Sequence, residues 1–275
     1  MDYVQPQKYA SENPETYSDL HVAPRINKWL LLAVSFLVGV GGWYLLTYFA
    51  DFPAFILPTP WLVFQRLVRA LSDGTLLWHT AITLGEVMIG LALGVGVATL
   101  LGYWLAKSPQ MERFLAPYIV ASQSVPVVAI APLLVIWFGP GLLSKVLICA
   151  LIVFFPVLVN IVVGLRSVSK DLRDMMRSLR ATRWQMLIHL EIPAAMPVLL
   201  GGLRIGATLS VIGAVVGEYV GADRGLGFLI NVGRGQYDTA LVFVAIFALV
   251  GMAMSLYGVV VHLENRLLAW NRTER

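Results

Sequence analysis

Residues 142–165 read LLSKVLICALIVFFPVLVNIVVGL, a run in which Lys145 is the only charged side chain. An α-helix needs about 20 consecutive apolar residues to cross the hydrocarbon core of a bilayer, so this run is long enough to span a membrane. Further runs of this kind lie at 28–50, 80–105, 114–138, 197–220 and 240–262. The sequence therefore predicts an all-α polytopic membrane protein with six transmembrane helices.

The overall composition agrees with a lipid-embedded chain. Of the 275 residues, 58% are apolar and only 13% are charged, and the mean hydropathy is +0.77. A water-soluble domain carries about 25% charged residues. A chain this apolar cannot bury all of its apolar surface within itself, so we expect it to lie in the inner or plasma membrane of a cell.

Polar segments flank the apolar region. Residues 1–27 hold three prolines and scattered charges without apolar periodicity, which predicts a polar N-terminal tail. The run at 28–50 is too long for a signal-peptide core, so we expect it to stay as the first span of a transmembrane domain over 28–262. Residues 263–275 form the predicted C-terminal tail. Between the first two spans, residues 60–71 predict a short amphipathic helix on the membrane surface.

The distribution of Lys and Arg predicts how the chain is oriented. Cytoplasmic connections of membrane proteins carry an excess of these residues. The side that holds both termini and the loop 166–196 has fourteen of them, and the opposite side has five. Those five are Arg66, Arg69, Lys145, Arg224 and Arg234. Both termini and the loop 166–196 are therefore predicted to be cytoplasmic.

The longest cytoplasmic connection has its own pattern. Residues 171–193 read DLRDMMRSLRATRWQMLIHLEIP, in which apolar residues recur at helical spacing. The pattern predicts two short amphipathic helices, joined near Arg180 and Thr182 and ending at Pro193. An apolar stripe in the cytoplasm needs a cover, which either the protein's own bundle or a partner could supply.

This segment resembles the EAA loop of ABC importer permeases. The family pattern is Glu-Ala-Ala, three residues, Gly, nine residues and then Ile-x-Leu-Pro. Here Asp174-Met175-Met176 takes the first place, Arg180 takes the place of Gly, and Leu190-Glu-Ile-Pro193 follows at the expected distance. Arg180 is the main departure, because Gly permits a positive φ that Arg resists, and this leaves the geometry of the turn open.

Other landmarks resemble one subfamily of these permeases, from about residue 55 to the C-terminus. They are Leu57-Pro-Thr-Pro60, Trp137-Phe-Gly139, Ser144-Lys145, Phe155-Pro156 with Asn160, Gly202-Leu-Arg204 and Gly225-Leu-Gly227. The subfamily imports nitrate, sulfonates, taurine, and vitamin-related compounds such as riboflavin and hydroxymethylpyrimidine. The sequence around 178–185 and 216–227 favours riboflavin or a pyrimidine vitamin precursor, with sulfonate, taurine or nitrate as the alternative.

The resemblance implies a type I ABC importer permease fold and a set of partners. A separate ATPase subunit would dock on the loop, a second permease copy would complete a homodimer, and an extracytoplasmic binding protein would deliver a small molecule. The coupling residues carried over are Asp174, Met175, Met176, Arg177, Leu179, Arg180, Ala181, Trp184 and Pro193. None of the five lysines follows a glycine, so the chain lacks a P-loop. We expect this chain to bind no cofactor and no nucleic acid. ATP is expected to bind to the partner ATPase subunit.

Some polar residues are candidates for contacts with the substrate or the binding protein. Glu86 and Asn160 lie within predicted spans and are candidate pathway residues; the alternatives are structural pairing for Glu86 and an interhelical hydrogen bond for Asn160. Glu218, Asp223 and Arg224 are candidate contacts with the binding protein, and the alternative is a solvated turn. Arg204 is expected to reach toward the headgroups and to brace the loop.

Two other classes of protein are alternatives to a permease. A polytopic membrane enzyme would place several acidic or histidine side chains at one membrane depth, but the span interiors offer almost none besides Glu86. A passive scaffold would not explain a partner-docking loop. The four histidines show no metal-ligand spacing, so no metal is expected. We therefore expect a transport protein without enzymatic activity of its own.

Overall fold

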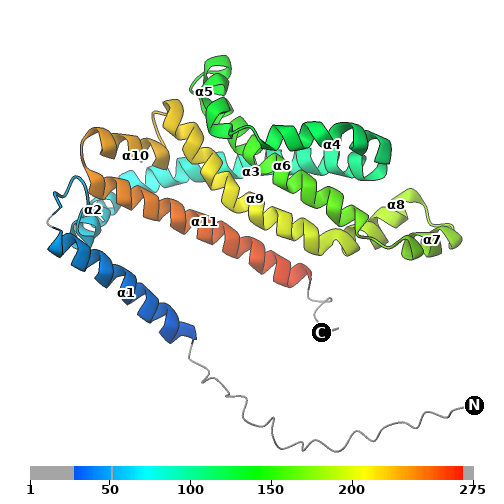
Figure 1. Ribbon diagram of the computed structural model, residues 1–275, viewed down its shortest axis with the longest axis horizontal. Helices are drawn as coiled ribbons and strands as arrows, with labels where there is room; N and C mark the ends of the chain where they lie inside the picture. Colours follow the sequence, from blue (N-terminus) through cyan, green and yellow to red (C-terminus); the bar gives the residue numbers. More distant parts are fainter. Residues whose placement is uncertain (1–27, 51, 269–275) are drawn as a thin grey trace, which may run out of the picture.

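The computed structural model describes residues 28–50 and 52–268, and all regular structure within these ranges is helical. Long helices lie side by side, and shorter helices lie at both ends of the bundle (Figure 1). The all-α fold class is thereby confirmed. The predicted N-terminal tail, 1–27, lies outside the described residues. So does the predicted C-terminal tail, 263–275, from residue 269 onward.

Within residues 28–50 and 52–268, four helical segments are long and apolar enough to cross a membrane. They are α3 (Thr75–Lys107), α6 (Leu142–Arg166), α9 (Ile192–Gly221, with the helical turns from Arg183) and α11 (Thr239–Leu267). They coincide with the second, fourth, fifth and sixth predicted spans. The α6 helix lies against both α3 and α9 and forms the centre of the bundle.

Close approach of small residues sets the distance between these central helices. Cys149 of α6 is fully buried and faces Gly90 of α3 and Gly213 of α9. A Cβ atom on Gly90 would lie 2.3 Å from the Cβ of Cys149, and one on Gly213 would lie 2.7 Å from its Cα. Only glycine fits at both positions, because any Cβ would collide with Cys149. Small residues of this kind let helix backbones pack closely in lipid.

The third predicted span, 114–138, is not one straight helix. It consists of α4 (Pro109–Gln123) and α5 (Val127–Phe138), which meet at an angle of 91°. Pro126 stands in the break and lacks the N–H that would continue the helical hydrogen bonding. The pair is therefore a broken span or a re-entrant segment rather than one straight span over 114–138.

The first predicted span corresponds to α1 (Lys28–Phe49), whose apolar stretch is shorter, Ala33–Phe49. Its outer half is held by Trp43, which stacks on Phe243 with ring centroids 5.2 Å apart. The indole N–H of Trp43 also donates to the carbonyl of Pro58 at 3.1 Å. The remainder of α1 diverges from the bundle (Figure 1).

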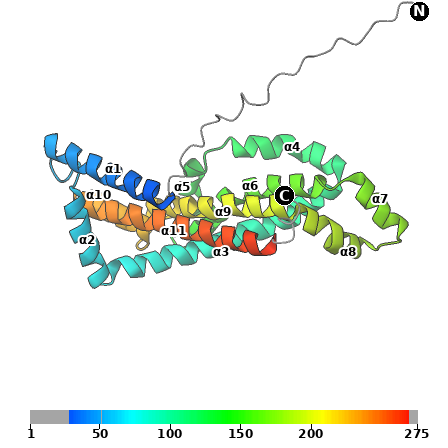
Figure 2. The ribbon, with the colours of Figure 1, turned by 90° about the horizontal axis from the view of Figure 1, so that it is seen from below.

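The short amphipathic helix predicted at 60–71 is confirmed as α2 (Pro60–Ser72). Thr59 caps its N-terminus by accepting a hydrogen bond from the Leu62 N–H, and Pro60 occupies the first turn. The helix buries Val63 and Ala70 and crosses the end of the bundle opposite α7 (Lys170–Ser178) and α8 (Arg183–Met186) (Figure 2). At the same end lies α10 (Leu226–Gly235), a helix that was not predicted from the sequence.

Candidate functional site

The loop 166–196 begins with α7, which ends in a turn of the type that glycine usually forms. The Ala181 N–H donates to the Met176 carbonyl at 3.0 Å, and the Arg180 N–H donates to the Arg177 carbonyl at 2.9 Å. These two bonds define a Schellman motif, in which the residue at the Arg180 position takes a left-handed conformation. Arg180 has a φ of 55°. The turn keeps the geometry that the family glycine favours, despite the arginine.

The second half of the loop runs into the membrane helix without a break. Thr182 and Gln185 form a capping box at the start of α8, and the chain continues through a π-helical turn, η2 (Leu187–Glu191), into α9. Pro193 cannot donate a backbone hydrogen bond, and the Ile192 N–H donates five residues back, to the Leu187 carbonyl. The predicted helix end at Pro193 is therefore wrong, because a π-bulge accommodates the proline.

Apolar side chains of the loop are uncovered in this structure. Leu179 is 71% exposed, Trp184 is 68% exposed and Met175 is 53% exposed, while Met176 is half-buried. Asp174 and Arg177 beside them pair with each other at 3.0 Å on the surface. We call Met175, Leu179 and Trp184 the coupling surface. The described part of the chain leaves it uncovered, which favours a partner over the protein's own bundle as the cover.

A buried carboxylate ties this loop to the bundle. Glu191 is 1% exposed, and both of its oxygens accept hydrogen bonds from Lys107 Nζ, at 2.5 and 2.7 Å. Arg173 of α7 lies 3.7 Å from the same carboxylate and donates to the Leu165 carbonyl at 2.6 Å. The ends of α3 and α6, the loop and the start of α9 are thus joined. Glu191 belongs to the Leu190-Glu-Ile-Pro193 motif, but the motif alone did not predict this role.

Arg204 does not have the predicted bracing role. Its guanidinium pairs with Glu264 of α11 and lies 5.5 Å from the centre of the Tyr257 ring. Both partners belong to α11, so Arg204 fastens α9 to α11 rather than to the loop. The prediction failed because residue spacing gives a side chain's depth along a helix but not the neighbouring helix that it faces.

At the opposite end of the bundle, Glu86 is a paired side chain in the interior. It is 2% exposed, and its Oε1 accepts a hydrogen bond from Lys145 Nζ at 2.8 Å. Lys145 is buried as well. The pair joins α3 to α6 and matches the structural alternative considered for Glu86. Its second oxygen, Oε2, has no hydrogen-bond partner among the residues that the structure describes.

Glu218 is also buried, so the prediction that it contacts a binding protein at the surface is wrong. Its exposed fraction is 0%; the Thr83 hydroxyl donates to Oε1 at 2.6 Å and the Gly227 N–H donates to Oε2 at 2.5 Å. A Cβ atom on Gly225 would lie 2.1 Å from this carboxylate. The Gly225-Leu-Gly227 motif therefore lets the N-terminus of α10 approach a buried carboxylate, which also suits the positive end of the helix dipole.

Asp223 and Arg224 lie at the surface, as the sequence suggested. Their side chains are both exposed and pair with each other at 2.9 Å, and the hydrogen bond from Arg224 lowers the pKa of Asp223 below its usual value. They form the rim of a cavity of about 420 Å³, whose wall includes Glu86, Lys145 and Gly85. We call this cavity the α3–α6 recess.

Asn160 packs between helices but makes no interhelical hydrogen bond that the structure shows. Its Nδ2 donates to the Pro156 carbonyl within α6, at 2.8 Å. Its Cβ faces Gly202 of α9, where an added Cβ would lie 2.7 Å away. The contact with α9 is therefore steric, and the predicted interhelical hydrogen bond is replaced by one within α6.

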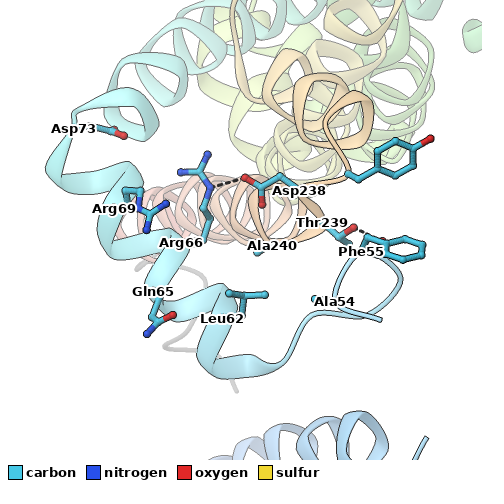
Figure 3. Close-up of a pocket in the computed structure, with 11 residues that line it drawn as sticks. Ala54, Phe55, Leu62, Gln65, Arg66, Arg69, Asp73, Asp238, Thr239 and Ala240 are labelled. Atoms are coloured by element: carbon cyan, nitrogen blue, oxygen red, sulfur yellow. Dashed lines mark hydrogen bonds and ion pairs between the residues drawn. The ribbon is translucent and has the colours of Figure 1, made fainter. Parts of the chain in front are cut away.

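A second and larger cavity lies between α2 and the start of α11 (Figure 3). It measures about 650 Å³, and the Arg66–Asp238 ion pair, with an N–O distance of 2.7 Å, crosses it. Thr239 donates to the Phe55 carbonyl at 2.5 Å and fastens the preceding loop. Tyr237 also lines this cavity; it has a φ of 57° and is 75% exposed. The sequence did not predict this cavity, because its walls come from segments far apart in the chain.

No metal centre is seen in the described part of the chain, where no three His, Cys, Asp or Glu side chains lie close enough together to hold an ion. What the structure does provide is a helical membrane bundle with an uncovered apolar loop at one end and buried charged residues at the other. These features define a polytopic membrane protein whose apolar loop is uncovered in the described ranges. Residues 90–269 match the family described as binding-protein-dependent transport system inner membrane component.

Individual relatives agree with this match. The chain is 44% identical to the riboflavin transport system permease protein RibX of Chloroflexus aurantiacus, over 93% of this chain and 98% of the relative. It is 37% identical to the formylaminopyrimidine transport permease protein ThiX of Halalkalibacterium halodurans, over 80% and 88%. It is 33% identical to a putative aliphatic sulfonates transport permease protein, SsuC of Bacillus subtilis, over 80% of each.

A solved structure supports the fold. The chain superposes with a TM-score of 0.57 on a chain of the MetNI methionine ABC transporter in an inward-facing conformation, covering 76% of this chain and 98% of that one at 19% identity. The chain belongs to the binding-protein-dependent transport system inner membrane component family and is a permease of the ABC importer type.

Proposed function

We propose that this chain forms the membrane pathway of an importer for riboflavin or a related vitamin precursor. The observation that carries the proposal is the 44% identity to a riboflavin permease across nearly the whole of both chains. A permease for formylaminopyrimidine follows at 37% identity. The alternative substrate, an aliphatic sulfonate or taurine, is supported by relatives at 33% identity.

The proposal includes three protein partners. An ATPase subunit covers the coupling surface and binds the ATP, a second copy of this chain completes the pathway, and an extracytoplasmic binding protein delivers the substrate. The uncovered apolar side chains Leu179 and Trp184 support the first partner. The ABC transporter architecture named for the structural neighbour supports an ATPase-driven assembly. The excess of Lys and Arg on the loop side supports cytoplasmic termini.

Transport by the whole assembly tests this function. The chain is co-expressed with its ATPase and binding protein, purified, and placed in proteoliposomes that contain ATP. We expect ATP-dependent accumulation of radiolabelled riboflavin and none of taurine. Accumulation of taurine without riboflavin would favour the sulfonate alternative, and ATP-independent flux of either would contradict an ATP-driven importer.

A further inference from the structure

The α3–α6 recess has features of a binding site rather than of a packing defect. Its volume of about 420 Å³ lies within the range of small-molecule sites, about 300–1,000 Å³. It opens between the outer part of α3, the turn before α6 and the turn after α9. On the α3 side, the space next to Gly85 is open, because an added Cβ there would meet nothing within 4 Å.

The wall of the recess carries a buried pair of charges with unused hydrogen-bonding capacity. Glu86 Oε1 is occupied by Lys145 at 2.8 Å, whereas Glu86 Oε2 is buried without a partner in the described ranges. A lysine ammonium can donate three hydrogen bonds, and Lys145 makes one with the side chains described here. A buried polar atom without a partner is costly, so an acceptor and donors side by side favour a ligand that supplies the missing bonds.

The charge balance of the recess favours a neutral ligand. Lys145 is already paired with Glu86, and Arg224 is already paired with Asp223. Glu218 adds another carboxyl group that interacts with Glu86 from the α9 side. A sulfonate entering here would meet the acidic side chains of Glu86 and Asp223 and two cations that are already paired. A neutral molecule that offers both a donor and an acceptor would meet no net repulsion.

We infer that the α3–α6 recess is a substrate subsite that recognises the amide-like edge of a neutral heterocycle, an N–H beside a carbonyl. The N–H donates to Glu86 Oε2, and the carbonyl accepts from Lys145 Nζ. This inference rests on the proposed function and narrows it, because the imide edge of a flavin has this arrangement whereas taurine does not. Glu86 thereby contributes to substrate selection as well as to pairing.

Ligand binding to the purified permease–ATPase complex in lipid nanodiscs tests the inference, without binding protein so that only this complex selects. The fluorescence of riboflavin and of 3-methylriboflavin, in which a methyl group replaces the imide hydrogen, reports the Kd of each. We expect the unmodified complex to bind riboflavin at least roughly tenfold more tightly than the methylated compound, because the methyl group removes a hydrogen bond to a charged acceptor.

The decisive variant is Glu86→Leu with Lys145→Met. Replacing both members of a buried ion pair by apolar residues of similar size commonly preserves the fold. This double variant should bind riboflavin more weakly and lose the preference over 3-methylriboflavin. Glu86→Gln, which keeps an amide oxygen as an acceptor at this position, should show a smaller loss of preference. Glu264→Gln is the matched control, since it neutralises a paired carboxylate at the other end of the bundle and should keep the wild-type preference.

The outcomes separate the two levels of the proposal. An unmodified complex without preference, a double variant with the wild-type preference, or a Glu264→Gln variant that loses it equally would each overturn the subsite. Riboflavin uptake by the wild type together with any of these results leaves the proposed function standing. Uptake of taurine instead of riboflavin in proteoliposomes overturns the proposed function itself.

Discussion

Arg180 shows how a single residue keeps the family's loop geometry at a cost. Its left-handed φ of 55° places its Cβ close to a carbonyl oxygen, which costs roughly 1–2 kcal/mol for a residue other than glycine. The Schellman bonds to Met176 and Arg177 hold it there nonetheless. The sequence identified the residue that departs from the pattern, but only the backbone shows that the turn survives the departure.

Arg180→Gly should therefore stabilise the loop. We expect the midpoint of thermal unfolding in detergent to rise, because the variant removes about 1 kcal/mol of backbone strain. Arg180→Ala, which keeps the Cβ atom and the strain, is the matched control and should give no increase. Equal midpoints for Gly and Ala would contradict a left-handed turn at this position.

Gly225 is required for a different reason, the approach of a carboxylate. Gly225→Ala should destabilise the protein by at least about 2 kcal/mol, since the new Cβ would collide with the buried Glu218 and φ is 110°. Gly251→Ala, in α11, meets nothing within 4 Å and should be neutral or slightly stabilising. Thermal unfolding of the two variants side by side checks this, and similar midpoints would mean that Glu218 can move away freely.

At the scale of elements, periodicity and run length predicted the apolar helices well, and chain breaks poorly. The spans at α3, α6, α9 and α11 follow from apolar length alone. Apolar length does not predict the 91° bend at Pro126 or the continuous helix through Pro193, because a proline can end, kink or merely widen a helix. Packing against neighbours decides among these outcomes. The same limit applies to Glu218, whose position at a helix end suggested a surface residue although Thr83 and α10 cover it.

The anchor at Glu191 is an element-scale prediction. Glu191→Ala leaves Lys107 and Arg173 without their shared partner, so α7 should loosen from the bundle, with a loss of roughly 1–3 kcal/mol. Hydrogen exchange of the α7 amides should become faster, while exchange in the centre of α6 should stay unchanged. An unaltered exchange rate in α7 would show that the loop does not depend on this carboxylate.

At the scale of the whole molecule, the distribution of positive charge predicts the orientation in the membrane. Cys149 is buried and should not react with a labelling reagent, so cysteines introduced one at a time can be labelled selectively. Arg180→Cys should resist a membrane-impermeant maleimide in intact cells and react after lysis, whereas Gln65→Cys should react in both. Labelling of position 180 from outside would overturn the topology.

We expect a separate ATPase to drive this permease by binding to the coupling surface. Burying a large apolar side chain contributes about 1.5–3 kcal/mol, and a charge placed there must also lose its water without gaining a partner. Leu179→Asp should therefore detach the ATPase while the membrane helices still insert. Arg177→Ala, an exposed member of a surface ion pair, should have little effect.

The most direct measurement is a pull-down of the ATPase with tagged permease, followed by ATPase activity in lipid nanodiscs, for wild type, Leu179→Asp and Leu267→Asp. Leu267 is a half-exposed leucine at the end of α11 that does not belong to the coupling surface, and it serves as the matched control. We expect Leu179→Asp alone to lose the ATPase and its substrate-stimulated activity. Full retention of that activity by Leu179→Asp would contradict the loop as the coupling element.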